Sequence, residues 1–264
     1  VEWFLAMHDV IRFVPPARTT LQRPLVWERL QRAGVDSGVL RFDFTYPAPG
    51  QARYVVSNHF GLDTWALALA TSTSDATAST DAARALGLEE PFRSRFDAAE
   101  FATLLPRPAR QPPDLPLDPF PVLRVAYKCD RDTFDAAERL VRGAPALPVA
   151  FVYLGGFDAV CHHFWQYRHP EDYGAAAPAA EDVAALGEVI DRFLEFLDRG
   201  LGHLLAAYER PPNVLIVSDH GHGAVVGHPI FRGWHDPHGL FIAAGPDLPH
   251  RAEPVPFGYF DVTP

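Results

Sequence analysis

Short apolar runs that end at turn residues and are separated by stretches with helical spacing constrain the fold of this chain more than any other feature. We expect strands at five of these runs, namely 38–44, 122–129, 148–156, 213–219 and 239–245. The unbroken apolar run at 148–156 is typical of a strand covered on both faces. Helical spacing predicts helices over 25–34, 132–143 and 181–209, the last as one long helix. This alternation predicts a doubly wound α/β fold, a mostly parallel sheet flanked by helices.

Size and charge limit the classes of protein to which the chain can belong. Its 264 residues are enough for one α/β domain, and we expect a single domain over 1–264. No apolar run reaches the roughly 18 residues that a membrane-spanning helix needs. The formal net charge of -10, with no cluster of Lys or Arg, argues against binding to a nucleic-acid polymer. A small anionic substrate fits this charge if a metal ion supplies the positive charge.

Residues 62–121 interrupt the alternation of strands and helices. An Ala/Ser/Thr-rich tract is followed there by a proline-rich tract. We expect a surface insertion with a partly extended connector, because such compositions do not build a packed core. A cap that shapes access of the substrate is the alternative interpretation.

Three polar clusters lie at the boundaries of expected strands. Asp158 and His162, four residues apart, follow the run 148–156, whereas Asp219 and His220 end the run 213–219 and His235 precedes 239–245. Functional groups of α/β sheets gather beyond the carboxyl ends of the strands. Any one of these residues is more often a helix cap or a packed histidine. Together they predict a site for a divalent metal, because carboxylate and imidazole without thiolate are typical ligands of hydrolytic zinc or manganese.

The position of His235 sets a condition on the fold, because this residue precedes its strand and the other candidates follow theirs. His235 can meet them if 239–245 runs antiparallel to its neighbours, which we favour, or if the preceding loop arches over the sheet edge. The two cysteines, Cys129 and Cys161, are too few for a thiolate zinc site or a disulfide framework. We expect both to be buried as small apolar residues.

Three segments, in this order, resemble the metal-binding segments of the alkaline phosphatase superfamily: YLGGFDAVCHHFWQY, VSDHGHG and GWHDPHGLFIAAGP. They are most similar to those of its type I phosphodiesterase/nucleotide pyrophosphatase branch. The resemblance extends to MHDVIRFV, RPLVWERLQRAGVDSGVLRFDFTYP and FDVTP, and thus to most of the chain outside 62–121. The combination of D-x-x-x-H, S-D-H-G and H-x-x-x-G in this order is specific, whereas each motif alone is not.

The resemblance implies a metal-dependent hydrolase of phosphoric esters, of the phosphodiesterase or nucleotide pyrophosphatase type, that acts on a small phosphorylated substrate. Asp158, His162 and His235 would hold one divalent ion, and Asp219 and His220 a second. Imidazole content favours zinc, and manganese would accept the same ligands. Two such ions can stabilise the attacking and leaving oxygens of an in-line displacement.

The family pattern also contains an aspartate after its first strand and a Thr or Ser nucleophile, neither of which has a match here. The chain opens within an apolar stretch at Val1 and stops at what resembles the start of a helix. We therefore expect both ends to be cut, the nucleophile to lie upstream of Val1, and the activity of this fragment to be impaired. The sequence leaves the compartment and the oligomeric state open.

Two alternatives to this interpretation stay open. The chain could belong to another branch of the superfamily, such as a sulfatase or a phosphomutase, although it contains no C-x-P-x-R or S-x-P-x-R segment. It could also be an inert metal-binding module that acts by interaction.

Several other polar residues receive no metal-binding role. His163 is the alternative to His162 and could support the site from behind the ligands, and His238 could contact substrate phosphate or nothing. His222 is expected to be a loop histidine. We expect a structural or capping role for the rest, Thr19, Thr20, His8, His59, His228 and Asp198.

Overall fold

The computed structural model of the protein describes residues 21, 23–48, 50–58, 78–85, 96–105, 119–144, 147–250, 253 and 258. Most of the expected insertion at 62–121 lies outside the described residues, as do the segments MHDVIRFV and FDVTP and the residues Thr19, Thr20, His8 and His59.

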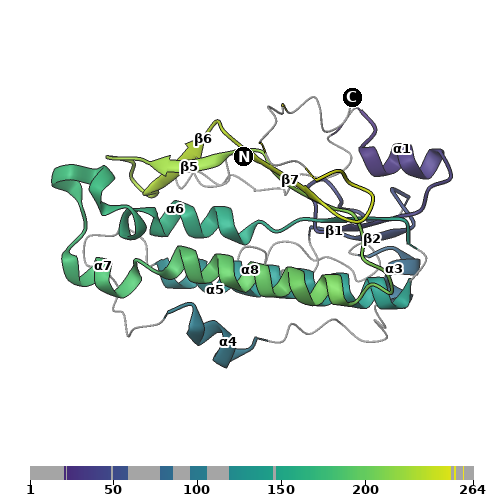
Figure 1. The fold of residues 1–264 in the computed structure, drawn as a ribbon, viewed down its shortest axis with the longest axis horizontal. Helices are drawn as coiled ribbons and strands as arrows, with labels where there is room; N and C mark the ends of the chain where they lie inside the picture. The colour runs from purple at the N-terminus through teal and green to yellow at the C-terminus, as the bar shows by residue number, and fades with distance from the viewer. Residues whose placement is uncertain are drawn as a thin grey trace, which may run out of the picture.

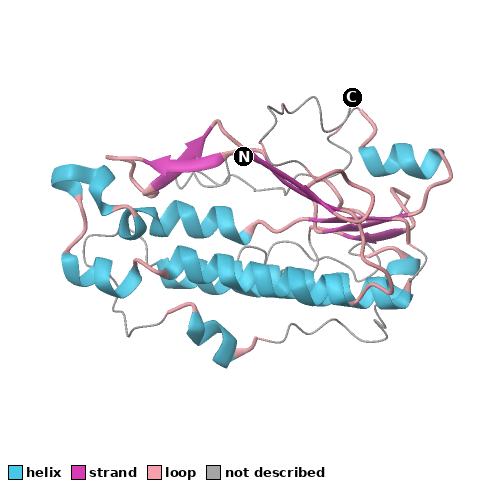
Figure 2. Cartoon of the chain, viewed as in Figure 1, coloured by secondary structure: helices cyan, strands magenta, loops and turns pink. Residues whose placement is uncertain are grey.

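Helices and strands alternate along the first part of the chain, and strands dominate its last part (Figure 1, Figure 2). The helices are α1 (Val26–Arg32), α3 (Thr80–Ala85), α4 (Ala98–Thr103), α5 (Pro119–Gly143), α6 (Gly156–Arg168), the 3-10 helix η2 (Pro170–Ala176), α7 (Ala180–Leu186) and α8 (Val189–Ala206). The strands are β1 (Ser37–Leu40), β2 (Tyr54–Val56), β3 (Val149–Val152), β4 (Val214–Ser218), β5 (Gly221–Ala224), β6 (Gly233–Asp236) and β7 (Leu240–Ala244).

A parallel sheet with the strand order β2-β1-β3 forms the centre of the α/β part. Side chains of the middle strand β1 alternate between its two faces. Val39 packs with Trp27 of α1 on one face, and Leu40 joins the main core with Leu140 of α5 on the other. The protein is therefore a mixed α/β fold with a parallel three-stranded sheet flanked by helices, consistent with the alkaline-phosphatase-like fold.

The main hydrophobic core lies between the helices α5, α6 and α8, which pack against one another, with β5 and β6 above α6 in Figure 1. Fully buried aromatic rings come from all three helices, including Tyr127, Phe164 and Phe193. Gly200 of α8 allows a close approach, because a Cβ atom there would overlap the ring of Phe134. Packing against α5 and α8 therefore fixes the position of α6, the helix on which the candidate ligands Asp158 and His162 lie.

The expected strand at 122–129 is wrong, because these residues form the first half of helix α5. The buried positions Leu123, Tyr127, Asp130 and Phe134 recur every three or four residues, which is the spacing of a helix with one covered face. The β-branched residues in this run indicate a strand locally, but packing against α6 and α8 decides the structure.

Three other expectations about secondary structure need correction. The strand expected at 38–44 ends at Leu40, since Arg41 and Phe44 have left-handed backbone angles. Strand β3 is only half-buried and lies at the edge of the described sheet, although Phe151 and Val152 pack against the clusters on its two faces. The helix expected over 181–209 is divided into α7 and α8 at Gly187, whose backbone lies so near Tyr167 that a Cβ would be 3.0 Å from the Tyr167 carbonyl oxygen.

The last part of the chain forms two antiparallel pairs, β4 with β7 and β5 with β6. The antiparallel direction expected for 239–245 is thus confirmed. Both cysteines are free thiols; Cys161 is buried and Cys129 is half-buried. Among the helices that the structure describes, none combines the length and apolar character needed to cross a membrane.

Candidate metal centre

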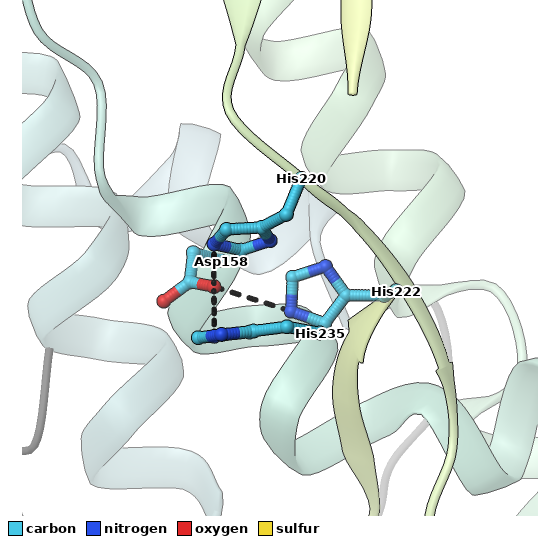
Figure 3. A group of neighbouring side chains, drawn as sticks. All are labelled: Asp158, His220, His222 and His235. Atoms are coloured by element: carbon cyan, nitrogen blue, oxygen red, sulfur yellow. Dashed lines mark ion pairs between the residues drawn. The ribbon is translucent and has the colours of Figure 1, made fainter. Parts of the chain in front are cut away.

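Four side chains from different elements meet beside the first turns of α6 (Figure 3). They are Asp158 from α6, His220 from the turn after β4, His222 from β5 and His235 from β6. One potential ligand atom from each lies within 4.8 Å of those of the other three. Residues more than seventy positions apart in sequence thus come together at one place.

Asp158 lies at the centre of this group. Its Oδ1 atom is 3.2 Å from Nε2 of His222, 3.5 Å from Nε2 of His235 and 3.8 Å from Nε2 of His220. This oxygen is buried and has no hydrogen-bond partner, and the same holds for Nε2 of His222. Buried polar atoms without partners are rare and call for an explanation such as a bound ion.

His162 follows Asp158 by one helical turn, so that both side chains lie on the same face of α6. Its Nε2 is 3.5 Å from Oδ1 of Asp158 and 3.1 Å from Nε2 of His235. The other ring nitrogen, Nδ1, lies 2.8 Å from the carbonyl oxygen of Gly233. A carbonyl only accepts, so Nδ1 carries the proton and Nε2 of the neutral ring presents a lone pair to the cluster.

Strand β6 is docked closely on α6, which makes the contact between His162 and Gly233 possible. The backbone N–H of Arg232 donates to the carbonyl oxygen of His162 at 2.8 Å. A Cβ atom at Gly233 would overlap the Cys161 carbonyl and lie 2.9 Å from Cβ of Trp165. Glycine at this position therefore lets β6 approach the helix and place His235 opposite His162.

His220 and His235 face each other as stacked rings, with centroids 3.8 Å apart. Nδ1 of His220 lies 3.0 Å from the carbonyl oxygen of Gly221 and must donate to it. Nε2 of His220 faces the carboxylate of Asp158, 3.8 Å from its Oδ1. As with His162, a backbone carbonyl selects the tautomer whose free nitrogen points at the cluster.

These donor atoms fit a divalent cation. Two ligands bound to one tetrahedral zinc ion at their usual bond lengths lie about 3.3 Å apart. The distances from Asp158 Oδ1 to the Nε2 atoms of His162, His222 and His235 are 3.2 to 3.5 Å. Lone pairs of a carboxylate and of neutral imidazoles repel one another at such distances, and a cation between them removes that repulsion.

Burial and mutual contact alter the pKa values in this group. Burial raises the pKa of Asp158, but the interaction with His222 and the fields of the other histidines outweigh it and lower the pKa below its ordinary value. Burial lowers the pKa of His162. Burial, together with the neighbouring His220, also lowers that of His235. An ionised carboxylate beside neutral imidazoles is the protonation state that binds metal ions.

Asp219 lies at the edge of the cluster. Its side chain is 80% exposed, and its Oδ1 is 3.7 Å from Nε2 of His220. The structure therefore brings together Asp158, His162, His220 and His235 of the five residues singled out from the sequence, and it places Asp219 beside them on the solvent side.

The expectation that His222 is a loop histidine is wrong. His222 lies on strand β5, and its side chain is only 6% exposed. A signal for this was present, because His220 and His222 are two residues apart and alternate residues of an extended chain point to the same face.

Three further histidines of the described part of the chain, His163, His228 and His238, have other contacts. His163 is buried against the ring of Phe231, and burial lowers its pKa to about 4. His228 has the structural role expected, since its Nδ1 accepts from the backbone N–H of Phe231 at 2.9 Å. His238 is exposed and pairs with Asp236 at 2.7 Å.

The N-terminus of α6 is held by Asp130, a fully buried residue of α5. Both carboxylate oxygens of Asp130 accept from the backbone N–H of Gly156, at 3.2 and 3.1 Å. Burial raises the pKa of Asp130 to about 7. A Cβ atom at Gly156 would collide with this carboxylate. Asp130 therefore caps the helix that carries Asp158 and His162.

Comparison with known proteins agrees with the geometry of this centre. The family model for type I phosphodiesterase / nucleotide pyrophosphatase matches residues 6–251. No curated protein and no solved structure matches the chain. Members of this family hydrolyse esters of phosphoric acid in small phosphorylated substrates and usually bind divalent metals. With almost its whole length covered by that match, the chain belongs to the type I phosphodiesterase/nucleotide pyrophosphatase family of the alkaline phosphatase superfamily.

Proposed function

We propose that this protein hydrolyses phosphoric diesters or the pyrophosphate bond of nucleotides with the help of two divalent metal ions. The observation that carries the proposal is the buried Oδ1 of Asp158, which has no hydrogen-bond partner and is surrounded by histidine Nε2 atoms. Burying these polar atoms without partners costs free energy, and a bound cation would offset that cost.

In this proposal Asp158, His162 and His235 hold one ion, and Asp219 and His220 hold the second. The separations of 3.1 to 3.5 Å among the first three ligands support their sharing one ion. The 3.7 Å between Asp219 and His220 supports a neighbouring second site. The abundance of imidazole favours zinc, and manganese would accept the same ligands.

The two ions would supply positive charge beside the phosphoryl oxygens and would favour ionisation of the attacking hydroxyl. The side chains of the protein keep the ligands ready for this task. Gly233 and Gly221 fix the tautomers of His162 and His220 through their carbonyl oxygens, so that no proton blocks the donor atoms. The net charge of -10 would otherwise repel an anionic substrate.

The family pattern also requires a Thr or Ser hydroxyl as the nucleophile, so the proposal is tested on the full gene product. We expect purified protein to contain about two equivalents of divalent metal and to hydrolyse a chromogenic phosphodiester, bis(p-nitrophenyl) phosphate. Chelation should abolish hydrolysis, and zinc or manganese should restore it. A protein that binds metal but cleaves neither the diester nor a sulfate ester is an inert binding module, and preferential cleavage of the sulfate ester indicates a sulfatase.

A further inference from the structure

The family match assigns no role to His222, yet this residue has the shortest contact with Asp158 among the histidines of the cluster. Its Nε2 lies 3.2 Å from Oδ1 of Asp158, and neither atom has a hydrogen-bond partner. The side chain is almost completely buried, with an exposed fraction of 6%. A buried imidazole nitrogen and a buried carboxylate oxygen at this distance have both lost their contact with water, and a cation between them would compensate both.

The backbone places His222 where a ligand of the same ion has to be. His222 and His235 are directly opposite each other in the antiparallel pair β5–β6, and opposed residues project from the same face of the ladder. Both rings thus point towards α6 and Asp158 (Figure 3). Gly221 and Gly223 flank His222 in the sequence. A Cβ atom at Gly221 would lie 2.8 Å from the carbonyl oxygen of His238, so glycine permits the close path of β5 at this point.

We propose that His222 is a further direct ligand of the ion held by Asp158 and His235, so that this site has one more imidazole than the family motif supplies. The inference rests on the proposed function only in requiring that a divalent ion binds at this cluster. An additional protein ligand has two consequences. It raises the affinity for the ion, and together with Asp158, His162 and His235 it fills the four positions of a tetrahedral zinc, so that substrate or water would bind there by expanding the coordination to five.

The arrangement also distinguishes a ligand from a residue that only orients Asp158. At 3.2 Å, Nε2 of His222 can pair with the carboxylate of Asp158 directly or share a cation with it, and the orientation of the rings separates these two roles. The ring of His222 stands nearly perpendicular to those of His162 and His235, at 78° and 85°. Rings that surround a common point from different directions are typical of ligands around one ion.

The test compares zinc binding by wild type, His222→Ala, His222→Gln and His203→Ala in the metal-free full-length protein. His203 is an exposed histidine of α8 and serves as the matched control. We expect both His222 variants to lose about 100-fold or more in affinity for the first zinc equivalent, and His203→Ala to bind like wild type. Circular dichroism checks that each variant is folded, and the Gln variant keeps a polar side chain of similar size.

X-ray absorption at one zinc equivalent counts the imidazoles bound to the ion and should find one fewer in both His222 variants. Equal affinity of variants and wild type would overturn the inference. A loss of affinity with an unchanged imidazole count would also overturn it, because His222 would then act by orienting Asp158. If the wild type itself binds no zinc or manganese, the proposed function fails as a whole, which is a different result from the failure of His222 alone.

Discussion

The two sides of the candidate metal centre are supported by very different parts of the molecule. Asp158 and His162 lie on α6, whose inner residues are buried in the helical core and whose first turn is capped by Asp130. His220, His222 and His235 lie on or beside short antiparallel pairs of strands. In the adjoining pair β4–β7 large apolar side chains are exposed, including Leu215 at 59%.

This difference indicates how the centre is organised before and after an ion binds. Packing of α6 fixes Asp158 and His162 without help, because a helix in a close-packed core has little freedom. Two-stranded ladders are marginal on their own and gain more from a cross-link. A bound ion would therefore link the rigid helix α6 to the less rigid strands. Most of the loss of backbone motion on binding would occur in the strands.

The largest expected effect tests whether the stability of the apoprotein comes from the α6 side. Phe164→Ala removes a fully buried ring from α6 and should lower the free energy of unfolding by about 3–5 kcal/mol. Leu215→Ala, the matched change on β4, should alter it by no more than about 0.5 kcal/mol, because this side chain is mostly exposed. Urea unfolding in the presence of a chelator measures both. Equal losses would show that the two sides contribute alike and would remove the basis of the comparison.

The second prediction concerns the two acidic residues. Asp158→Asn should weaken zinc binding by more than about 100-fold, because it removes charge from the buried oxygen around which the histidines converge. Asp219→Asn should weaken it by about tenfold for the second equivalent only, since this carboxylate faces solvent. Calorimetric titration of the metal-free protein separates the two equivalents. A larger effect of Asp219 than of Asp158 would place the stronger site on the strand side.

The third prediction concerns amide hydrogen exchange in α6 and in the strands, where we expect a smaller effect. On removal of the ion, backbone amides of β5 and β6 should lose protection by about tenfold or more, whereas those in the middle of α6 should change little. The measurement is made on one sample before and after chelation. Uniform loss across α6 and the strands would mean that the centre unfolds as one unit.

The meeting of Asp158, His162, His220 and His235 was predictable from the sequence, because strand ends in α/β folds converge and each of these residues flanks an expected strand. The exposure of Asp219 was not predictable from position alone, whereas the two-residue spacing of His220 and His222 already indicated that both side chains face the same way. Whether a residue next to a strand end points into the site depends on where the extended backbone begins again. Here β5 resumes at Gly221 and turns the side chains of His220 and His222 the same way.

Prediction of the fold from the sequence was also only partly successful. The alternation of apolar runs and helical stretches predicted a mostly parallel sheet, and the position of His235 before its strand favoured an antiparallel β7. Helix α5 was missed in its first half because Val122 and Val125 favour a strand locally. Its buried face is created by α6 and α8, which lie more than ten residues further along the chain. The helical recurrence of Leu123, Tyr127 and Phe134 becomes clear over a window longer than the apolar run 122–129.

The smallest expected effect concerns Asp130, which connects the core to the α6 side. In the unfolded chain its carboxyl group loses its proton near the ordinary pKa of 3.8, whereas burial in the folded protein raises the pKa to about 7. Between these values folding takes up a proton, so the contribution of Asp130 to stability is complete at low pH and is lost as the pH rises towards 7. An asparagine side chain at this position would not titrate and would keep an oxygen that accepts from the N–H of Gly156.

Asp130→Asn should therefore gain stability relative to wild type between pH 5 and pH 7, by up to about 1.4 kcal/mol per pH unit. Unfolding free energies of both proteins at pH 5, 6 and 7 measure this difference, with chelator present to exclude metal binding. Asp198→Asn, on the exposed side of α8, is the control for losing one carboxylate. If the difference between Asp130→Asn and wild type stays constant over this range, the carboxylate is ionised throughout, and α6 is held at its N-terminus by a charged cap instead of a neutral one.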